Sequence, residues 1–563
     1  MSRPFPPDPP QNLPEALERA ARHFPRRGIA VFEGRGAAAR RRVYPDVLAG
    51  AREAAGRWAA LGLAPGDRVL VCLPTSWAWL DAWLGALLAG ALPVAVAPGA
   101  AMGAGEAQVR KVDALAEHLD ARFAVVPPAF RAAAEELGAR RAAAAAITAE
   151  ELAAQAPARL AAPRPAPEDV AFLQLTSGST GVPRAVMIPH RAAVHNPLAN
   201  DEAIGAPHGA PAHAWAESMV SWLPLNHDMG LVGCFFMSVL AGLDLWLLQP
   251  TAFLARPRLW LAELGRHGTV FTPAPNFGYQ LCLERLSSAD REGLDLSRWR
   301  DAMTGAEMIR QETVEGFCAA FAPCGFRPET FRPCYGLAEA TLAATFDLEG
   351  RGLRTRPAPA GAAAGLGISD VACVGRPVRD TEVRVAGPDG RALPEGEVGE
   401  VRVRGPGVFL GYYNEPEATR ESLQDGWLAT GDLGFQAGGE LYLTGRSKDV
   451  LILRGNNLMP HELEWLAESV VGGGGALRCG AFSVARDAHG EEPVLVVETT
   501  DRDPGKLAEL GHAIRSAVGR NLSLPVADLI FVRRGKIPKT TSGKVQRRAL
   551  RELYLEGRLE RLR

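Results

Sequence analysis

The chain has 563 residues, of which 47% are hydrophobic and 22% charged, with a formal net charge of -2. This length predicts two or more domains, because one hydrophobic core rarely grows so large. The balanced charge argues against a nucleic-acid-binding protein. The eight cysteines form no C-x-x-C pair, which argues against a zinc site or a disulfide framework and favours a reducing cytoplasm.

The first hundred residues predict alternating helices and strands. Residues 12–60 have a helical pattern with a short strand, and residues 69–73 have the pattern of a buried strand. The most membrane-like run, residues 77–100, contains Asp81 and Pro93. We therefore interpret it as a buried helix followed by a core strand, and we expect no stable membrane insertion. The Pro-rich amino terminus lacks the apolar core of a signal peptide.

The middle of the chain predicts α/β layers. Residues 129–165 are rich in alanine and predict a surface helix followed by a Pro-bearing linker. Residues 170–175 form a short apolar strand that leads into a glycine-rich loop, and strands and helices then alternate up to residue 340. Residues 350–370 are low in complexity, which is typical of a loop or an inserted segment.

The last third of the chain changes pattern twice. From residue 371 it reads as alternating strands, with TEVRV, EVGEVRVRG and GELYLTG as the clearest examples. After Arg446 a smaller unit begins, with strand and helix signals of its own. We therefore predict a main domain over 1–446 and a carboxyl-terminal domain over 447–563.

The first chemical motif, TSGSTGVPR at residues 176–184, directly follows a predicted strand. Backbone N–H groups of such a loop can converge on an anion, hydroxyl side chains add donors for phosphate oxygens, and Arg184 adds a fixed charge. The motif does not fit the G-x-x-x-x-G-K-[ST] pattern of a Walker A loop. Taken alone, a run of this composition is more often a flexible loop.

Two further motifs place polar groups in apolar sequence. YGLAEAT at 335–341 combines an aromatic ring, a glycine and the Glu339 carboxylate in one turn, which suits base stacking, close backbone approach and Mg²⁺ binding. NHD at 226–228 lies in apolar surroundings, where polar side chains cost free energy unless they are hydrogen-bonded. A core turn explains the first motif equally well, and a hydrogen-bonded loop histidine explains the second.

The last two motifs lie near the predicted domain boundary and near the end of the chain. TGDLG and GRSKD supply Asp432, able to accept from both ribose hydroxyls, and Arg446, able to reach the ribose or the phosphates. IPKTTSGKVQRR supplies Lys544 on a glycine-containing loop, where it can act as a mobile cation. Separately, these motifs are more often surface ion pairs and a basic solvated tail.

In this order, the motifs resemble those of the adenylate-forming superfamily of acyl-CoA synthetases, peptide-synthetase adenylation domains and luciferases. The stretches SWLPLNHDMGL, TPAPNFGYQLC, LDLSRWRDAMTGAEMIR, RPCYGLAEATL and RGNNLMPHELE are most similar to fatty acyl-AMP ligases. The resemblance implies an α/β fold with a large domain of layered β-sheets flanked by helices, a small β-barrel-like subdomain and a small mobile α+β domain. It also implies that the segment at about 350–370 is the insertion that hinders coenzyme A chemistry in that family.

The resemblance implies a reaction as well. A fatty acid carboxylate attacks the α-phosphorus of ATP with Mg²⁺ bound, pyrophosphate leaves, and the acyl group passes to an acyl carrier protein supplied in trans. In this assignment Lys544 stabilises the transition state, His227 lies at the acyl pocket, Thr176 and Glu339 hold the metal, and Lys448 is the hinge. The remaining nucleotide-binding residues would be Ser177, Gly178, Ser179, Thr180, Gly181, Arg184, Gly305, Ala306, Glu307, Tyr335, Gly336, Asp432 and Arg446.

Two residues depart from the family pattern, and three alternatives remain open. Arg184 stands where many relatives carry lysine, and Asn226 stands where an aromatic residue commonly precedes the His-Asp pair. The nearest alternative is a fatty acyl-CoA synthetase, which would end on coenzyme A. Another is an amino-acid-activating adenylation enzyme, which would usually carry an aspartate in the acid pocket. A non-catalytic nucleotide-binding regulator is disfavoured because Lys544, Glu339 and Asp432 are all present.

Overall fold

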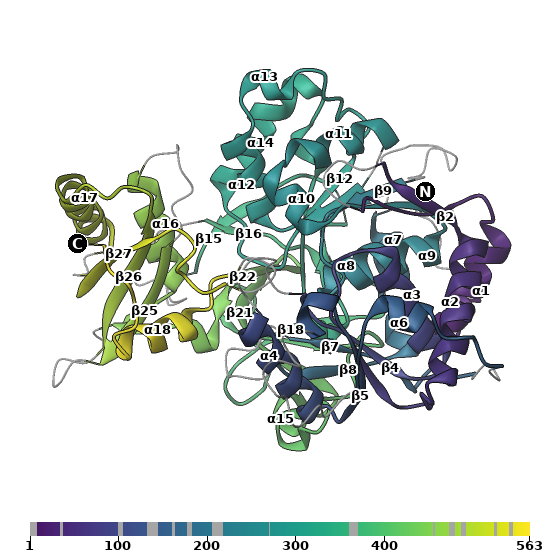
Figure 1. Ribbon diagram of the computed structural model, residues 1–563. Helices are drawn as coiled ribbons and strands as arrows, with labels where there is room; N and C mark the ends of the chain where they lie inside the picture. The colour runs from purple at the N-terminus through teal and green to yellow at the C-terminus, as the bar shows by residue number, and fades with distance from the viewer. Residues whose placement is uncertain are drawn as a thin grey trace.

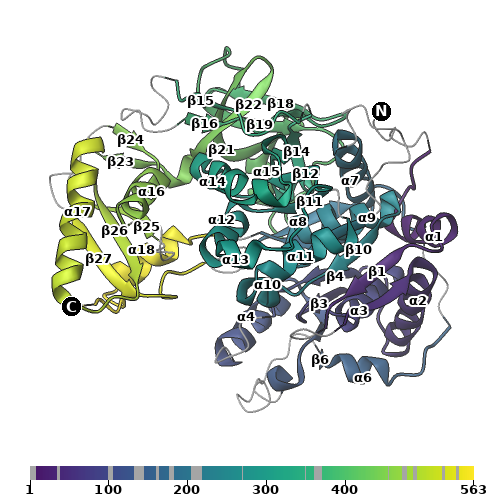
Figure 2. The same cartoon turned by 90° about the horizontal axis from the view of Figure 1, so that it is seen from above.

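The computed structural model has a large body and a smaller unit at the carboxyl end of the chain (Figure 1). Both views place this unit, which carries α16, α17 and α18, against one side of the body (Figure 2). The structure describes residues 8–33, 38–98, 105–131, 145–159, 164–176, 183–204, 218–268, 271–348, 350–359, 370–453, 456–471, 479–485, 491–522, 526–539 and 544–562.

The amino-terminal part of the body is built on a six-stranded sheet in the order β6-β5-β3-β4-β7-β8. Neighbouring strands are parallel except β7 and β8, which are antiparallel. The strands are β3 (Arg68–Val71), β4 (Leu92–Ala95), β5 (Ala121–Val125), β6 (Ala145–Ile147), β7 (Val170–Leu175) and β8 (Ala185–Pro189). The predicted strand at 170–175, which leads into the first motif, is confirmed.

Helix α3 (Trp77–Leu88) accounts for the most apolar run of the sequence. Apart from Asp81, which pairs with Arg42 at 2.6 Å, it is apolar, as expected of a helix inside a core, and Trp83 is fully buried. Ser76 caps the first turn by accepting from the Trp79 N–H at 3.2 Å. Strand β4 follows directly, so the predicted buried helix and core strand are confirmed. Within the described ranges, no helix is long and apolar enough to cross a membrane.

The surface helix expected within residues 129–165 falls largely on residues 132–144, which, like 160–163, lie outside the described residues. The described part contains helical residues 129–131, strand β6, which pairs with β5, and the short helix α6 (Ala149–Ala153). Backbone hydrogen bonding to the sheet edge therefore outweighs the helix propensity of alanine at 145–147.

Two more sheets complete the core of the body. One has the order β2-β1-β10-β9, with β2 (Arg40–Val43), β1 (Gly28–Val31), β10 (Asp244–Leu247) and β9 (Ser218–Ser221). The other has the order β11-β12-β13-β14-β17, with β11 (Phe271–Ala274), β12 (Asp301–Thr304), β13 (Phe331–Gly336), β14 (Ala343–Phe346) and β17 (Arg376–Pro377). A fully buried ion pair of 2.7 Å, between Arg332 Nε and Asp301 Oδ1, ties β13 to β12.

Helices cover these sheets. Those before residue 242 are α1 (Leu13–His23), α2 (Tyr44–Ala60), α4 (Gly105–His118), α7 (His190–Ile204), α8 (Asp228–Gly230), the π-helix η2 (Leu231–Phe236) and α9 (Met237–Ala241). Those after it are α10 (Pro250–Ala255), α11 (Arg258–His267), α12 (Asn276–Arg285), α13 (Ser288–Arg291), α14 (Gln311–Phe321) and the 3₁₀ turns η3 (Ala322–Cys324), η4 (Pro328–Thr330) and η5 (Ala338–Ala340).

A small antiparallel sheet forms the barrel-like part that the resemblance implied. Its strands are β18 (Glu382–Ala386), β19 (Gly399–Arg404), β20 (Leu423–Gln424), β21 (Trp427–Ala437) and β22 (Glu440–Arg446), accompanied by α15 (Pro416–Ser422). The sequence predicted β18, β19 and β22. It predicted no strand at TGDLG, whereas the structure places Asp432 inside the 11-residue strand β21.

The segment at 350–370 is joined to this sheet at both ends. Strand β15 (Thr355–Pro357) pairs with β16 (Asp370–Ala372), while residues 360–369 lie outside the described residues. Arg354 reaches both carboxylate oxygens of Glu440 on β22, at 2.5 and 2.7 Å. An isolated bridge joins Cys373 to Tyr442. The ends of the segment are therefore anchored to β22.

The carboxyl-terminal unit follows the 3₁₀ turn η6 (Ser447–Asp449) and the hairpin of β23 (Leu451–Leu453) and β24 (Asn456–Leu458). Its sheet contains β25 (Cys479–Ala485), β26 (Glu491–Thr499) and β27 (Asp528–Arg533). Alternate residues of β26 join two hydrophobic clusters, one with α16 (Pro460–Val471) and α17 (Pro504–Leu522), the other with α18 (Arg547–Leu555). This unit therefore has an α+β core of its own, while the domain boundary at 446 and 447 stays a prediction.

Candidate active site

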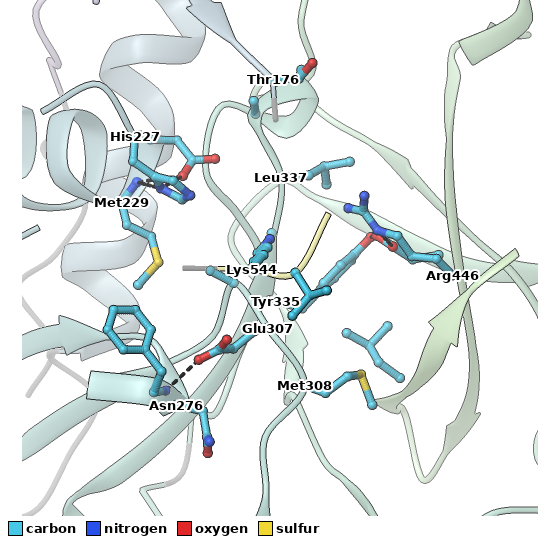
Figure 3. Close-up of a pocket in the computed structure, with 18 of the residues that line it drawn as sticks. Thr176, His227, Met229, Asn276, Glu307, Met308, Tyr335, Leu337, Arg446 and Lys544 are labelled. Atoms are coloured by element: carbon cyan, nitrogen blue, oxygen red, sulfur yellow. Dashed lines mark hydrogen bonds and ion pairs between the residues drawn. The ribbon is translucent and has the colours of Figure 1, made fainter. Parts of the chain in front are cut away.

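A cavity of about 1750 Å³ lies between the body and the carboxyl-terminal unit (Figure 3). Its lining includes the carboxyl ends of parallel strands β4, β7, β11, β12 and β13, which is where ligands bind in parallel sheets. Strands β21 and β22 line another part of it, and α16 and the segment around Lys544 close it from the carboxyl-terminal side. With the exception of Gly305, the predicted site residues within the described ranges therefore all line this one cavity.

Tyr335, Asp432 and Arg446 form a hydrogen-bonded group in this cavity. The Tyr335 hydroxyl donates to Asp432 Oδ2 at 2.7 Å, and Arg446 Nε donates to Asp432 Oδ1 at 2.9 Å. Asp432 and Arg446 are cross-strand partners on β21 and β22. Burial, together with the Asp432 carboxylate, raises the pKa of Tyr335 well above its ordinary value, so the phenol stays neutral and donates. These contacts fix the Tyr335 ring against the wall of the cavity.

The segment Gly305, Ala306 and Glu307 follows β12 and is held in an unusual conformation. A Cβ on Gly305 would come within 2.7 Å of the Cys334 carbonyl oxygen, so only glycine fits beside β13. Ala306 has a φ of 67°, which costs a non-glycine residue about 1 kcal/mol or more and is typical of functional sites. Glu307 Oε1 accepts from the Phe277 N–H at 2.6 Å. The strain is located at the wall of the cavity, where Ala306 and Glu307 line it.

Thr176, Arg184 and Glu339 line another region of the cavity. The Thr176 N–H donates to the Arg184 carbonyl at 2.9 Å, which closes the base of the first motif. Arg184 Nε lies 3.1 Å from Glu415 Oε2, and its guanidinium lies over the Tyr412 ring. The Arg184 charge is thus already shared with a carboxylate. Ser177, Gly178, Ser179, Thr180 and Gly181 lie outside the described residues.

The Glu339 carboxylate is suited to a hard cation. Burial raises its pKa, although the Tyr412 hydroxyl, which donates to Oε1 at 2.8 Å, acts in the opposite direction. Within the described ranges no group of three or more His, Cys, Asp or Glu side chains could hold a metal by itself. Mg²⁺ is usually held by one or two protein oxygens together with substrate phosphates. Thr176, the other residue predicted for the metal, lines the same cavity.

His227 and Asp228 stand where the NHD motif enters α8. His227 Nδ1 lies 2.6 Å from Asp228 Oδ1, so Nε2 is the ring nitrogen that can face a substrate. Gln174 Nε2 donates to the Asn226 carbonyl at 3.0 Å and holds the loop against β7. Burial alone would raise the pKa of Asp228, but the charges of His227 and Lys544 hold it below its ordinary value.

Lys544 projects into the centre of this arrangement, between His227 and Tyr335 (Figure 3). Burial and the Arg446 charge lower its pKa, while three carboxylates of the body, Asp228, Glu307 and Asp432, act in the opposite direction. The sequence indicated Glu307 and Asp432 for other roles and missed Asp228. The sequence signal that could have indicated Asp228 is its position next to His227 in the NHD motif. Lys448, the predicted hinge residue, is exposed on η6 at the rim of the cavity.

An apolar arm of the cavity runs along η2, and the sequence did not predict it. Met229, Gly233 and Met237 recur every four residues and line this arm. A Cβ on Gly233 would come within 2.9 Å of Leu342 Cδ2 on the opposite side. π-helical turns such as η2 are frequent at functional sites, and here one turns a small residue and two flexible thioethers toward the cavity.

A cavity at the carboxyl ends of parallel strands, with a lysine brought in by a terminal unit, is the architecture of an adenylate-forming ligase. The model of the family described as AMP-binding enzyme matches residues 17–413. The chain belongs to this family of AMP-binding enzymes.

Curated relatives cover most of the chain. It is 34% identical to a putative acyl-CoA synthetase of Caulobacter vibrioides, over 97% of this chain and 95% of the relative. It is 36% identical to the medium-chain-fatty-acid–[acyl-carrier-protein] ligase JamA of Moorena producens, over 70% of this chain and 69% of the relative. It is 33% identical to the long-chain-fatty-acid–AMP ligase FadD26 of Mycobacterium tuberculosis, over 88% of this chain and 89% of the relative.

Solved structures agree with these relatives. A structure from a study of fatty acyl-adenylate ligases from E. coli and L. pneumophila has a TM-score of 0.86 at 29% identity, covering 99% of both chains. An L. pneumophila fatty acyl-adenylate ligase in complex with acyl adenylate and pyrophosphate has a TM-score of 0.70 at 29% identity, covering 97% of this chain and 96% of that one. The fold expected from the resemblance is confirmed.

Proposed function

We propose that this enzyme activates a fatty acid by joining its carboxylate to the AMP portion of ATP, with release of pyrophosphate. The observation that carries the proposal is the position of Lys544, which lies in one cavity with the Tyr335–Asp432–Arg446 group and the His227–Asp228 pair. Relatives named as fatty-acid ligases and a matching structure with bound acyl adenylate support it.

In the proposed reaction, a carboxylate oxygen attacks the α-phosphorus and the bond to pyrophosphate breaks, so the leaving electron pair stays on pyrophosphate. Two anions must approach each other, and preorganised cations stabilise the charge that develops. Lys544 would bridge the carboxylate and the α-phosphate. Asp432 would accept from the ribose hydroxyls, and Tyr335, Gly336 and the 305–307 segment would enclose the adenine.

Thr176 and Glu339 would hold Mg²⁺ on the phosphates, where the cation would offset the charge of the triphosphate and of the leaving pyrophosphate. The chain itself contributes the buried carboxyl group of Glu339, which must be ionised to bind the cation. The Tyr412 hydroxyl favours the charged form of Glu339 by donating to it. The 176–181 loop and Arg184 would bind the β- and γ-phosphates.

A fatty acid fits the acid side of the cavity better than an amino acid does. An amino acid would need a carboxylate for its ammonium group, and Asp228 is the nearest carboxylate to His227. Asp228 is already engaged by His227, by the Met229 N–H and by the Lys544 charge. The apolar arm lined by Met229, Gly233 and Met237 lies directly beyond it and suits an alkyl chain.

We further propose that the acyl group passes to the phosphopantetheine thiol of an acyl carrier protein supplied in trans. The anchored ends of the 350–370 segment support this acceptor, because Arg354 and the Cys373–Tyr442 bridge tie the segment to β22, the strand that leads to the predicted hinge. The relative named as an acyl-carrier-protein ligase supports it too. Relatives named for coenzyme A keep that thiol as the second candidate.

The test of both proposals is pyrophosphate release followed by a transfer assay. Octanoate, laurate, palmitate and a set of amino acids are each incubated with enzyme, ATP and Mg²⁺. We expect release with fatty acids only. Coenzyme A and a phosphopantetheinylated carrier protein are then compared as acceptors, and we expect acyl transfer to the carrier protein. Pyrophosphate release driven by amino acids would refute the proposal that the substrate is a fatty acid. Faster transfer to coenzyme A would refute the proposal that the acceptor is a carrier protein.

We place the enzyme in the cytoplasm. All eight cysteines are present as free thiols, and each has a pKa raised mainly by burial, which makes it unreactive. Unpaired buried thiols fit a reducing compartment. Fractionation of cells that express the tagged protein tests this placement.

A further inference from the structure

We propose that Arg310 is a positioning residue for Lys544: it docks helix α16 onto the body, and α16 holds the segment that carries Lys544. The inference rests on the proposed function, because it concerns the lysine assigned to adenylation. The contact of Arg310 with α16, between the body and the carboxyl-terminal unit, determines when Lys544 can reach the cavity.

The first link of this chain of contacts joins the body to α16. Arg310 Nη1 lies 2.5 Å from Glu468 Oε2, and the Arg310 guanidinium lies 5.2 Å from the centre of the Trp465 ring. Both side chains of the ion pair are 23% exposed, so water screens the contact only partly. Arg310 thus makes a charged contact and a cation–π contact with the same helix.

The second link is α16 itself. His461, Glu464, Trp465 and Glu468 recur with helical spacing and all line the cavity, so one face of α16 is turned toward the body. Leu463 and Ala467, on the opposite side, are fully buried in the core of the carboxyl-terminal unit. The helix therefore moves together with that unit and transmits its position rigidly.

The third link joins α16 to the lysine segment. Arg547 reaches both carboxylate oxygens of Glu464 at 2.7 Å, and it also lies 3.1 Å from Asp449 on η6. Arg547 is three residues after Lys544 in the chain. Between them, Val545 bridges Lys539, and the Gln546 N–H donates to the Pro538 carbonyl at 2.9 Å. A displacement of α16 therefore displaces Lys544.

Arg310 is also joined to the part of the body that we assign to the nucleotide. Its N–H donates to Asn276 Oδ1 at 3.1 Å, and the next residue of α12, Phe277, donates to Glu307. Glu307 in turn is one of the carboxylates that act on Lys544. The segment 305–310 thus contacts both the nucleotide side of the cavity and the docked helix, which couples docking to the site.

The strength of this contact suits a joint that must open again. An ion pair of this exposure combined with one cation–π contact shifts a docking equilibrium on the order of tenfold. Such a contact favours the docked arrangement without preventing its release. Transfer of the acyl group to a thiol requires access to the carbonyl that Lys544 covers, so the undocked arrangement is needed in the second half-reaction.

The experiment compares the two half-reactions in Arg310→Ala, with Arg420→Ala as the matched control. Arg420 forms an exposed ion pair with Glu417 on α15, and neither of these two side chains lines the cavity. We expect Arg310→Ala to lower pyrophosphate release about tenfold with little change in the KM for ATP. Transfer from chemically prepared acyl adenylate should keep its wild-type rate or rise. Arg310→Lys, which keeps the charge, should recover part of the adenylation rate.

Two further measurements support the test. Charge exchange separates the loss of the ion pair from a general loss of stability, and solution scattering reports docking without an activity assay. Glu468→Arg should lower adenylation, and Arg310→Glu with Glu468→Arg should restore it at least partly. Small-angle X-ray scattering should show a more extended particle for Arg310→Ala than for wild type.

Superimposable scattering curves, or equal losses in both half-reactions, would overturn the proposal. A rise in the KM for ATP alone would assign Arg310 to the nucleotide instead. Wild-type enzyme that adenylates no acid, while Arg310→Ala still extends the particle, would refute the proposed function and leave the docking role in place.

Discussion

Tyr335 and Asp432 are 97 positions apart in the chain, and the Tyr335 hydroxyl donates to Asp432 at 2.7 Å. This hydrogen bond joins the end of β13 in the core of the body to β21 in the barrel-like sheet. It orients the ring assigned to the adenine and the carboxylate assigned to the ribose with respect to each other. One nucleoside can therefore contact both only if the two sheets keep this relative position.

Asp432→Ala is expected to weaken ATP binding about 10- to 100-fold, because it removes a charged acceptor and leaves the buried Tyr335 hydroxyl without its partner. Tyr335→Phe removes the donor alone and is expected to weaken binding less. Calorimetric titration with a nonhydrolysable ATP analogue measures both. An unchanged affinity in Asp432→Ala would remove that residue from the ribose.

Lys544→Ala is expected to lower adenylation by roughly 10²–10³-fold, the usual loss for one preorganised electrostatic group. Transfer from supplied acyl adenylate should remain near the wild-type rate. The measurement is pyrophosphate release for the first step and thioester formation for the second. Lys536→Ala, which removes an exposed lysine paired with Glu560 in the same unit, is the control. Near-wild-type pyrophosphate release from Lys544→Ala would contradict the assigned role.

Gly233→Leu is expected to shorten the acids that the enzyme accepts. Even a Cβ at this position comes within 2.9 Å of Leu342 Cδ2, so a leucine side chain must occupy the apolar arm. Activity with palmitate should fall at least tenfold relative to octanoate, as the ratio of kcat/KM values. Gly519, where an added Cβ meets nothing within 4 Å, offers the control Gly519→Leu. An unchanged preference in Gly233→Leu would place the alkyl chain elsewhere.

Docking of α16 is expected to depend on pH through Glu468. Burial raises the pKa of this carboxyl from 4.5 to about 7, and Glu464 acts in the same direction, against the Arg310 charge and the Cys479 N–H. Because Arg310 lowers this pKa and forms its ion pair only with the ionised carboxylate, the contribution of the pair to docking is present above pH 7 and is lost as pH falls through 7. The Cys479 thiol, whose own pKa is raised well above its ordinary value by burial, stays neutral throughout this range.

Glu468→Gln tests this dependence, because it keeps the size of the side chain and removes its titration. Above pH 7 the variant should dock less firmly than wild type, since its neutral amide cannot form the ion pair with Arg310. Below pH 6 the two should behave alike. The readout is scattering together with pyrophosphate release at each pH. If scattering and pyrophosphate release change with pH in the same way for wild type and Glu468→Gln, then Glu468 does not control docking in this pH range.

Local sequence signals predicted the regular elements that bury a continuous apolar face. Helix α3 and strands β4 and β7 belong to this group, because nearly all of their residues are apolar. Strand β6 and strand β21 were missed. The first is an alanine-rich edge that pairing with β5 makes extended, and the second contains Gly431, Asp432 and Gly434, which read locally as a turn. Pairing with β19 and β22 overrides that local preference.

The sequence by itself determined which chemical groups this enzyme has: a hydroxyl-rich loop after a strand, a Tyr-Gly-Leu-Ala-Glu turn, a His-Asp pair and a lysine near the end of the chain. Such groups are recognisable because a motif and its immediate neighbours set the local backbone. Only the tertiary structure decided that Asp228, Glu307 and Asp432 surround Lys544, and that Arg310 meets Trp465 and Glu468. Charge interactions depend on distance in space, and that distance is set by how the body and the carboxyl-terminal unit pack.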